Sequence, residues 1–253
     1  MPSARKIKRI CLFGDSALAA YRHALTEGLV QLPGIEVEFF GAPGPSFRSF
    51  ESLNGRIVPG PEALPALSLV NGAGRTSLGP DDFDAFLFIG ARLGAADFVA
   101  AHIHLARGSG LPSRAVQEAM AYDFLIRVRA WRFARDFARH RPVMFIPTPY
   151  PTEGILDLST RNRLFAYYPR AEFATVADRA RAWQMLMDVS QKSGVPLLAQ
   201  PDHTVTRGVL TQARYATKDA AAKEDISHKS PEFAALMLQN WYALWQNRAK
   251  IDA

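Results

Sequence analysis

Residues 8–16 read Lys-Arg-Ile-Cys-Leu-Phe-Gly-Asp-Ser, and this segment carries the clearest sign of fold class. Residues 10–13 are all apolar, as in a strand buried on both faces of a parallel sheet. Gly14 ends the run, and an amphipathic pattern extends from Leu18 to about Leu32. A strand followed at once by a helix predicts the first unit of an α/β fold.

The same alternation repeats along the chain. Four further apolar runs are predicted as strands, at 35–40, 84–89, 143–146 and 195–199. Amphipathic helices are predicted at about 113–140, 178–193 and 230–247. Together these elements predict a parallel five-stranded sheet with helices on both faces.

Local signals refine two of these helices and one insertion. Gly194 suits the residue just past a helix end, while Ser230 and Pro231 suit a helix start. Residues 51–82 break the alternation with short apolar pieces at 56–58 and 67–70. We expect a small β insertion there, within a single domain spanning 1–253.

Composition excludes several classes of protein. Of the 253 residues 48% are hydrophobic and 21% are charged, which rules out wholesale disorder. The net charge of +6 fits an anionic partner, but it is also ordinary for a soluble protein that binds none. Cys11 is the only cysteine, so an intramolecular disulfide and a cysteine-based zinc site are excluded.

The sequence predicts a cytoplasmic protein. The apolar stretch near the N-terminus is too short for a signal peptide, and no run approaches the ~18 apolar residues of a membrane span. Phosphate-loop and dinucleotide glycine motifs are absent, and the basic and aromatic residues of 129–133 would face different sides of a helix. We therefore expect no membrane span and no nucleic-acid partner, and the oligomeric state is left open.

Three loops after predicted strands or before the last helix suit acyl-transfer chemistry, because sites in open parallel sheets form beyond the carboxyl ends of the strands. Ser16 offers a hydroxyl and an unbonded N–H at a helix start, although a plain N-cap is the ordinary alternative. Gly44 can point its N–H at a ligand or simply form a Gly-Pro turn. Asp225 can hold Nδ1 of His228 and leave Nε2 as a base, or the two are a chance surface pair.

These residues resemble the blocks of the SGNH hydrolases, also called GDSL esterases and lipases. Residues 13–16, Phe-Gly-Asp-Ser, resemble the first block, Gly44 the second-block glycine, and residues 225–228, Asp-Ile-Ser-His, the last block. The resemblance spans 13–228 and implies a flavodoxin-like three-layer α/β/α sandwich.

The resemblance also assigns roles. It implies Ser16 as the nucleophile, His228 as the base and Asp225 as the residue that orients it. The N–H groups of Ser16 and Gly44 would form the oxyanion hole. No metal and no organic cofactor is implied, and Asp15 is expected beside the substrate.

The third block departs from the family pattern. That block is Gly-x-Asn-Asp, whose Asn donates to the oxyanion, whereas residues 90–93 here are Gly-Ala-Arg-Leu. Losing one oxyanion donor typically costs about 10²–10³ in rate. Arg92 can act as a substitute donor or bind a substrate carboxylate or phosphate, it can be structural, or catalysis is lost.

The residues and the resemblance together predict a serine esterase acting on a small-molecule or glycan ester. The resemblance alone implies the expected substrate, an O-acetyl or short acyl ester on a carbohydrate. An O-acyltransferase on the same triad and a non-catalytic glycan- or protein-binding module are the alternatives. Residues 51–82 and 94–112 are expected to shape the pocket. His102-Ile103-His104 alternates like a strand and makes a weak metal candidate, and Arg132, Arg135 and Arg139 form a basic stripe of the long helix.

Overall fold

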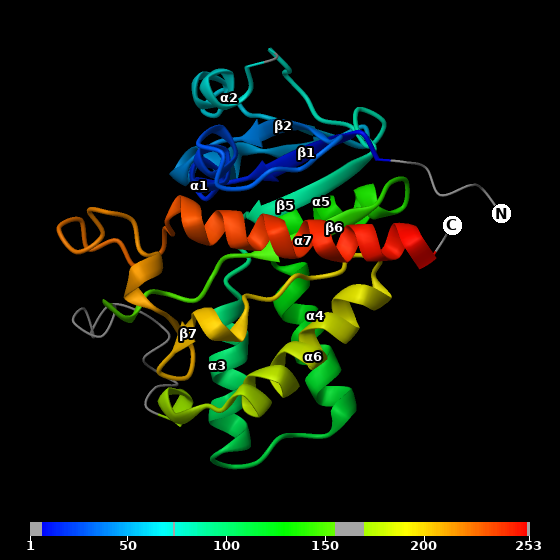
Figure 1. Ribbon diagram of the computed structural model, residues 1–253. Helices are drawn as coiled ribbons and strands as arrows, with labels where there is room; N and C mark the ends of the chain where they lie inside the picture. The colour runs from blue at the N-terminus through cyan, green and yellow to red at the C-terminus, as the bar shows by residue number, and fades with distance from the viewer. Residues whose placement is uncertain (1–6, 73, 155–169, 252–253) are drawn as a thin grey trace.

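The computed structural model describes residues 7–72, 74–154 and 170–251 and contains a parallel sheet covered by helices on both faces (Figure 1). The strands are β1 (Arg9–Gly14), β2 (Glu36–Gly41), β5 (Ala85–Gly90) and β6 (Val143–Pro147). Their order is β2-β1-β5-β6, and every neighbouring pair is parallel. The predicted α/β class and parallel sheet are confirmed.

The prediction of a fifth strand at 195–199 is wrong, because this segment forms only a single bridge to the sheet. Residues 195–199 lie beside β6, where Phe145 pairs with Leu197 in a single parallel bridge. Phe145 donates to the carbonyl of Pro196 at 2.9 Å and accepts from Leu198 at 2.8 Å. Pro196 has no N–H to extend the ladder, so the regular sheet among the described residues has four strands.

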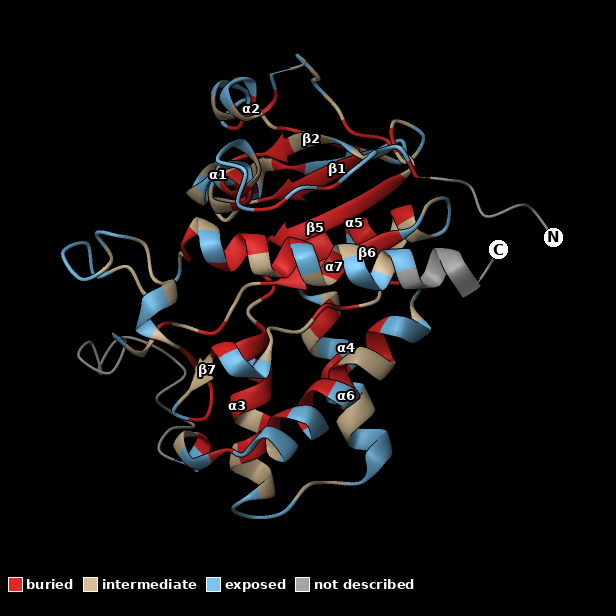
Figure 2. Ribbon diagram, in the orientation of Figure 1, coloured by how far each residue is buried: buried red, intermediate tan, exposed pale blue. Residues whose placement is uncertain are grey.

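Two helical layers cover the sheet, because alternate strand residues face opposite sides. Ile10 and Leu12 pack in one cluster with α1 (Leu18–Thr26) and α7 (Pro231–Ile251). Cys11 and Phe13 face the other cluster, to which the remaining helices of that side contribute: α3 (Ala95–Ala106), α4 (Arg114–Ile126), α5 (Arg129–Ala138) and α6 (Val176–Lys192). Figure 2 shows β1, β5 and β6 almost entirely buried, whereas the edge strand β2 is only partly buried.

Two predicted helices have different limits. The first ends at Thr26 rather than Leu32, because Gly28 adopts a left-handed φ of 71° and stops it. The helix predicted over 113–140 is two helices, α4 and α5, separated at Val128, whose backbone is extended. Arg129 then donates to the carbonyls of Arg48 and Phe50 at 2.6 and 2.9 Å, which ties the start of α5 to another part of the chain.

The insertion is partly helical. β3 (Glu51–Leu53) and β4 (Arg56–Val58) form an antiparallel hairpin after the 3₁₀ helix at Gly44–Ser49. The strand-like piece at 67–70 lies instead in α2 (Leu64–Val70), which buries Leu67 and leaves Leu69 78% exposed. A second hairpin joins β7 (Val205–Thr206) to β8 (Leu210–Thr211). Among the described residues, no helix combines the length and the apolar character that crossing a bilayer requires.

Candidate active site

Ser16 lies in the turn between β1 and α1, at the carboxyl edge of the sheet. The strand ends at Gly14, which passes so close to β5 that an added Cβ would lie 2.3 Å from the carbonyl oxygen of Ile89. Glycine is therefore required where β1 ends. Ala17, not Ser16, is the N-cap of α1, and no side chain caps the helix. The Ser16 hydroxyl is thus available for another partner.

That partner is His228. Ser16 Oγ lies 2.7 Å from His228 Nε2, and His228 Nδ1 lies 2.7 Å from Asp225 Oδ2. When Nδ1–H donates to the carboxylate, Nε2 accepts from the serine hydroxyl. The structure thus brings into contact the three residues that the sequence singled out, across a separation of 212 residues. Their order and distances suit a nucleophile, a base and an orienting carboxylate.

The loop before α7 holds Asp225 in its charged form. Burial opposes ionisation, but hydrogen bonds from His228 and from the Ser227 N–H outweigh it and lower the pKa of Asp225. The backbone N–H groups of Ser227 and His228 both lie 3.0 Å from Oδ1, which leaves Oδ2 for the imidazole. One carboxylate therefore fixes both the loop and the ring that follows it.

The turn after β5 has an unusual backbone. Gly90, Ala91 and Arg92 all have left-handed φ values, of 61°, 45° and 62°. This conformation is strained for Ala and Arg, at about 1–3 kcal/mol for each residue. At Gly90 an added Cβ would also lie 2.9 Å from Asp15 Oδ1. The strain lies directly beside the triad, where backbone strain often has a functional reason.

Asp15 joins this turn to the nucleophile. Its Oδ1 accepts from the N–H of Ala17 at 3.1 Å, and its Oδ2 accepts from the N–H of Arg92 at 3.2 Å. The residue lines the cavity in front of Ser16, as expected for a substrate neighbour. Both of these donors are backbone N–H groups, so in this structure Asp15 supports the two turns.

Arg92 crosses from this turn to the loop after β2. Its Nη2 donates to the carbonyl oxygen of Gly44 at 2.6 Å, and Gly44 itself has a left-handed φ of 54°. The side chain is exposed and lines the triad cavity, whereas Gly44 does not line it. Arg92 therefore contacts Gly44 and shares the cavity with Ser16, while the oxyanion hole and the direction of the Gly44 N–H toward substrate stay predictions.

The triad opens into a cavity of about 780 Å³, within the size range typical of ligand sites. Its walls come from residues near the nucleophile, from the exit of β6 and from the segment before α7, including Tyr21, Pro147–Pro149, Thr217–Asp219 and Lys223. The prediction that residues 51–82 and 94–112 shape the pocket is wrong, except that Gly94 lines the cavity. Those segments instead form the β3–β4 hairpin, α2 and α3, which contribute buried residues to the larger hydrophobic cluster.

Sequence reasoning missed Lys229. Its side chain is buried, and its Nζ donates to the carbonyls of Ser227 at 2.8 Å and Ile226 at 3.2 Å. Burial lowers the pKa of Lys229 to about 7, while the charge of Asp225 opposes this shift. Its position next to His228 was visible in the sequence, but nothing in the local pattern marks a lysine as buried.

The remaining sequence candidates lie elsewhere. His102 and His104 belong to α3, not to a strand, and His102 Nε2 contacts Gln117 Oε1 at 3.2 Å. No cluster of metal-ligating side chains occurs within residues 7–72, 74–154 and 170–251. Arg132 is exposed on α5, Arg139 is exposed directly after the end of α5, and Arg135 lies over the ring of Trp131 at 5.8 Å.

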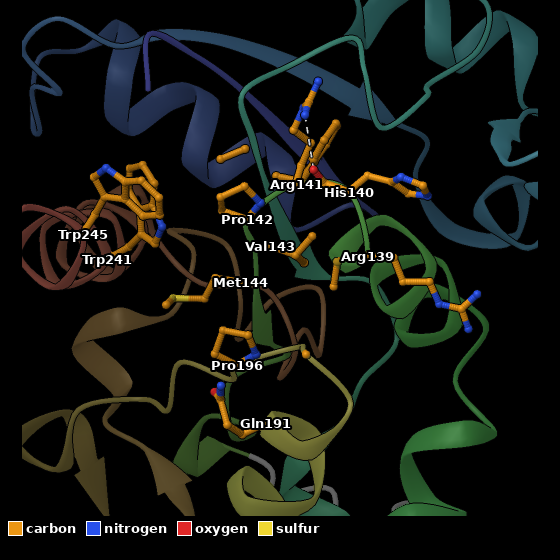
Figure 3. Close-up of a pocket in the computed structure, with 14 residues that line it drawn as sticks. Arg139, His140, Arg141, Pro142, Val143, Met144, Gln191, Pro196, Trp241 and Trp245 are labelled. Carbon is orange, nitrogen blue, oxygen red and sulfur yellow. Dashed lines mark hydrogen bonds between the residues drawn. The ribbon is translucent and has the colours of Figure 1, made fainter. Parts of the chain in front are cut away.

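A second cavity, of about 320 Å³, lies at the opposite edge of the sheet, near the starts of β5 and β6. Figure 3 shows Trp241 and Trp245 on one side of it and Met144 and Pro196 on another. Arg139 points away from the two tryptophans in this view. The cavity contains none of the residues assigned to the triad or the oxyanion hole.

Comparisons with known proteins add little detail. No protein-family profile matches the chain, and no curated protein matches its sequence. Among solved structures, the periplasmic domain of a lipopolysaccharide acetyltransferase from Salmonella ser. Paratyphi A aligns with 9% identity and a TM-score of 0.42, over 92% of this chain and 81% of that one. A lipase from a goat rumen metagenome aligns with 10% identity and a TM-score of 0.38, over 92% and 96%.

Proposed function

We propose that this protein is a serine esterase of the SGNH type, with Ser16, His228 and Asp225 as its catalytic triad. The observation that carries the proposal is the unbroken hydrogen-bonded chain from Ser16 Oγ through the imidazole to Asp225, with 2.7 Å at each junction. The chain lies at the carboxyl edge of a parallel sheet and faces a cavity large enough for a small ester.

The reaction would proceed in two steps. Ser16 Oγ attacks the ester carbonyl while His228 Nε2 takes the hydroxyl proton, and the alcohol leaves with a proton from the same imidazole. Water then attacks the acyl-Ser16 with His228 again as base, and the acid is released. Asp225 stabilises the imidazolium and keeps Nδ1 protonated throughout.

The negative oxygen of each tetrahedral intermediate needs donors. The N–H groups of Ser16 and Gly44 are the proposed ones, with Arg92 in place of the family's Asn. The guanidinium lies within reach of this edge because it already contacts the Gly44 carbonyl at 2.6 Å. It has five N–H donors, so one contact with a carbonyl leaves others for substrate.

The proposed substrate is an O-acetyl or short acyl ester, with a carbohydrate as the alcohol. This assignment rests on the resemblance to SGNH enzymes that act on acetylated carbohydrates. Transfer of the acyl group to a sugar hydroxyl is the alternative, since the same acyl-Ser16 can react with an alcohol instead of water. A purely binding role is disfavoured, because a site without catalysis has no need of Ser16 Oγ at hydrogen-bond distance from an oriented imidazole.

The test is intact mass after exposure to a fluorophosphonate probe, with wild type and Ser16→Ala in parallel. We expect one adduct on the wild type and none on the variant, because the probe reacts with an activated serine. Ser49→Ala is a matched control, since that hydroxyl donates to the Ser46 carbonyl at 2.8 Å and has no imidazole partner. Absence of an adduct on folded wild type would overturn the esterase assignment and favour the binding module.

Hydrolysis and transfer are separated by a second measurement. Wild-type protein is incubated with an acetyl ester, with and without a sugar acceptor, and released acetate is compared with acetylated sugar. Release of acetate that the acceptor does not reduce supports hydrolysis. Acetylated sugar as the dominant product supports the transferase.

A further inference from the structure

The cavity in front of the triad contains a cation that no described carboxylate neutralises. Two of the acidic residues that line the cavity already have a charged or ionisable partner. Asp225 holds the catalytic imidazole, and Asp219 pairs with Lys223 at 3.1 Å. The third, Asp15, accepts from two backbone N–H groups. Arg92 has no ion pair with any described carboxylate, and its side chain donates only to the neutral carbonyl of Gly44.

Lys218 adds a second positive charge, which interacts electrostatically with Glu232. It lines the same cavity, its side chain is exposed, and it forms no ion pair with the residues that the structure describes. Positive charge around a cleft raises the local concentration of anions and speeds their association. The cavity therefore favours a negatively charged ligand over a neutral one.

The guanidinium of Arg92 suits this role for geometric reasons. It is planar, stays charged at neutral pH and binds carboxylate or phosphate oxygens through pairs of N–H groups. The contact with Gly44 holds one end of the group beside the loop after β2, so fewer rotamers are lost when an anion binds. A donor for the oxyanion alone requires no net charge, as the family's Asn illustrates.

The backbone conformation of the turn also favours a role for Arg92 in binding an anion. Arg92 has a left-handed φ of 62°, a conformation that Gly or Asn adopts at much lower cost than Arg. The chain accepts this strain at a position that reaches the triad cavity. A surface arginine with no function there would bring strain without any gain from its charge.

We propose that the substrate is an ester that carries a carboxylate or phosphate, and that Arg92 binds this anionic group. The proposal rests on the esterase function above and adds a substrate class to it. The negative group then fixes the ester with its carbonyl toward Ser16. Lys218 assists entry of the anion without being its main contact.

The test uses pairs of esters that differ only in charge. One pair places the charge on the acyl side, 4-nitrophenyl hydrogen adipate against 4-nitrophenyl methyl adipate. The other places it on the alcohol side, 3-acetoxybenzoate against 3-acetoxybenzamide. We expect wild type to favour the anionic member of at least one pair in kcat/KM by about ten- to a hundredfold, the effect of one charge-assisted hydrogen bond.

Variants separate anion binding from oxyanion support. Arg92→Gln should bring the ratio of anionic to neutral kcat/KM close to one through KM, while loss of the proposed oxyanion contact lowers kcat for both members alike. Arg92→Lys should restore part of the ratio, because lysine keeps the charge but not the paired N–H groups. Arg127→Gln, at an exposed residue directly after α4, makes the same change in net charge and should leave the ratio unaltered. If Arg92→Gln slows both members equally, Arg92 is an oxyanion donor or a structural contact, and the anion proposal is overturned.

A binding measurement distinguishes failure of this proposal from failure of the esterase. Titration of phenyl phosphate and of phenol into Ser16→Ala, and into Ser16→Ala with Arg92→Gln, reports the anion site without catalysis. Phenyl phosphate should bind only to the protein that retains Arg92. Phenol should bind the two proteins with equal affinity. If wild type cleaves the anionic and neutral members of both pairs equally, only the anion site is overturned. If wild type cleaves no ester but phenyl phosphate binding depends on Arg92, only the esterase function is overturned. Absence of both results overturns both proposals.

Discussion

Lys229 places a buried amine next to the histidine that the proposed reaction uses as its base. Its Nζ donates to two carbonyls of the loop that carries Asp225 and His228. These contacts support the loop, but a buried ammonium is unfavourable in the folded state. The consequence is a stability that depends on pH.

We expect the stability of the protein to rise between about pH 7 and pH 10. The pKa of Lys229 is about 7 in the folded protein and ~10.4 for an unfolded lysine. In this window the unfolded chain binds more protons, so raising the pH favours folding, by on the order of 4 kcal/mol at most. In Lys229→Met this dependence should disappear.

Urea unfolding at about pH 6, 8 and 10 measures this effect, with Lys192→Met as an exposed lysine control. The stability of Lys229→Met relative to wild type should be highest at the lowest pH and decline as the pH rises. A difference that stays constant across the series would show that Lys229 is charged in both states or neutral in both.

At this scale, the residues that sequence reasoning identified and those it missed differ in kind. Ser16, Asp225 and His228 could be named because their spacing fits both a local motif and a family pattern. Lys229 and Lys218 could not, because their importance comes from burial and from missing ion pairs. Both properties depend on which distant segments pack around them.

Among the elements, α6 has the most complete start. Thr175 accepts from the N–H of Asp178, and Asp178 Oδ2 accepts from the N–H of Thr175 at 2.9 Å, which forms a reciprocal capping box. The Thr175 N–H is the largest cause of the lowered pKa of Asp178, about 2; burial opposes the shift and Arg107 adds to it.

Asp178→Ala should lower the free energy of unfolding at pH 7 by about 1 kcal/mol, the usual cost of a lost cap. Because the folded pKa is depressed, the carboxylate stabilises above the unfolded value of ~3.9, and this stabilisation is lost as the pH falls toward 2. Unfolding curves at neutral and acidic pH test this. Asp123→Ala, an exposed residue of α4, is the control, and a cost that persists at pH 2 would contradict the assignment.

Element types were easier to predict than element limits. Buried strands such as β1 and β5 follow directly from short apolar runs. The break between α4 and α5 has no strong local signal, because periodicity continues through Val128. The bonds of Arg129 to the carbonyls of Arg48 and Phe50, which hold the start of α5, join segments far apart in the sequence. The helix at 64–70 was mistaken for a strand because a short apolar run fits both periods.

At the scale of the whole molecule, the order β2-β1-β5-β6, with 195–199 beside β6, places the site where chain direction across the sheet reverses. From β1 the chain moves to β2 on one side and later to β5 on the other, which opens a crevice at their carboxyl ends. Ser16 follows the end of β1 and Arg92 follows the end of β5, and these two strands border the crevice. The parallel sheet could be predicted from the sequence, but the cavity walls could not, since they come from loops without a regular pattern.

α7 links this site to the core of the molecule. It begins at Pro231, shortly after His228, and packs against α1 through a cluster that includes Leu238, which is 0% exposed. Leu238→Ala should lower the free energy of unfolding by about 2–5 kcal/mol, because a cavity remains. Leu244→Ala, at 46% exposure on the same helix, should change it by less than about 0.5 kcal/mol. Equal effects in denaturant unfolding would contradict this packing.

The distance along the chain between Ser16 and His228 also has a consequence during synthesis. The nucleophile leaves the ribosome before its base, which follows 212 residues later. At about 5–20 residues per second, the growing chain carries a serine without a base for some ten seconds or more. The proposed hydrolase would therefore be inert until its base has been synthesised and α7 has packed against α1.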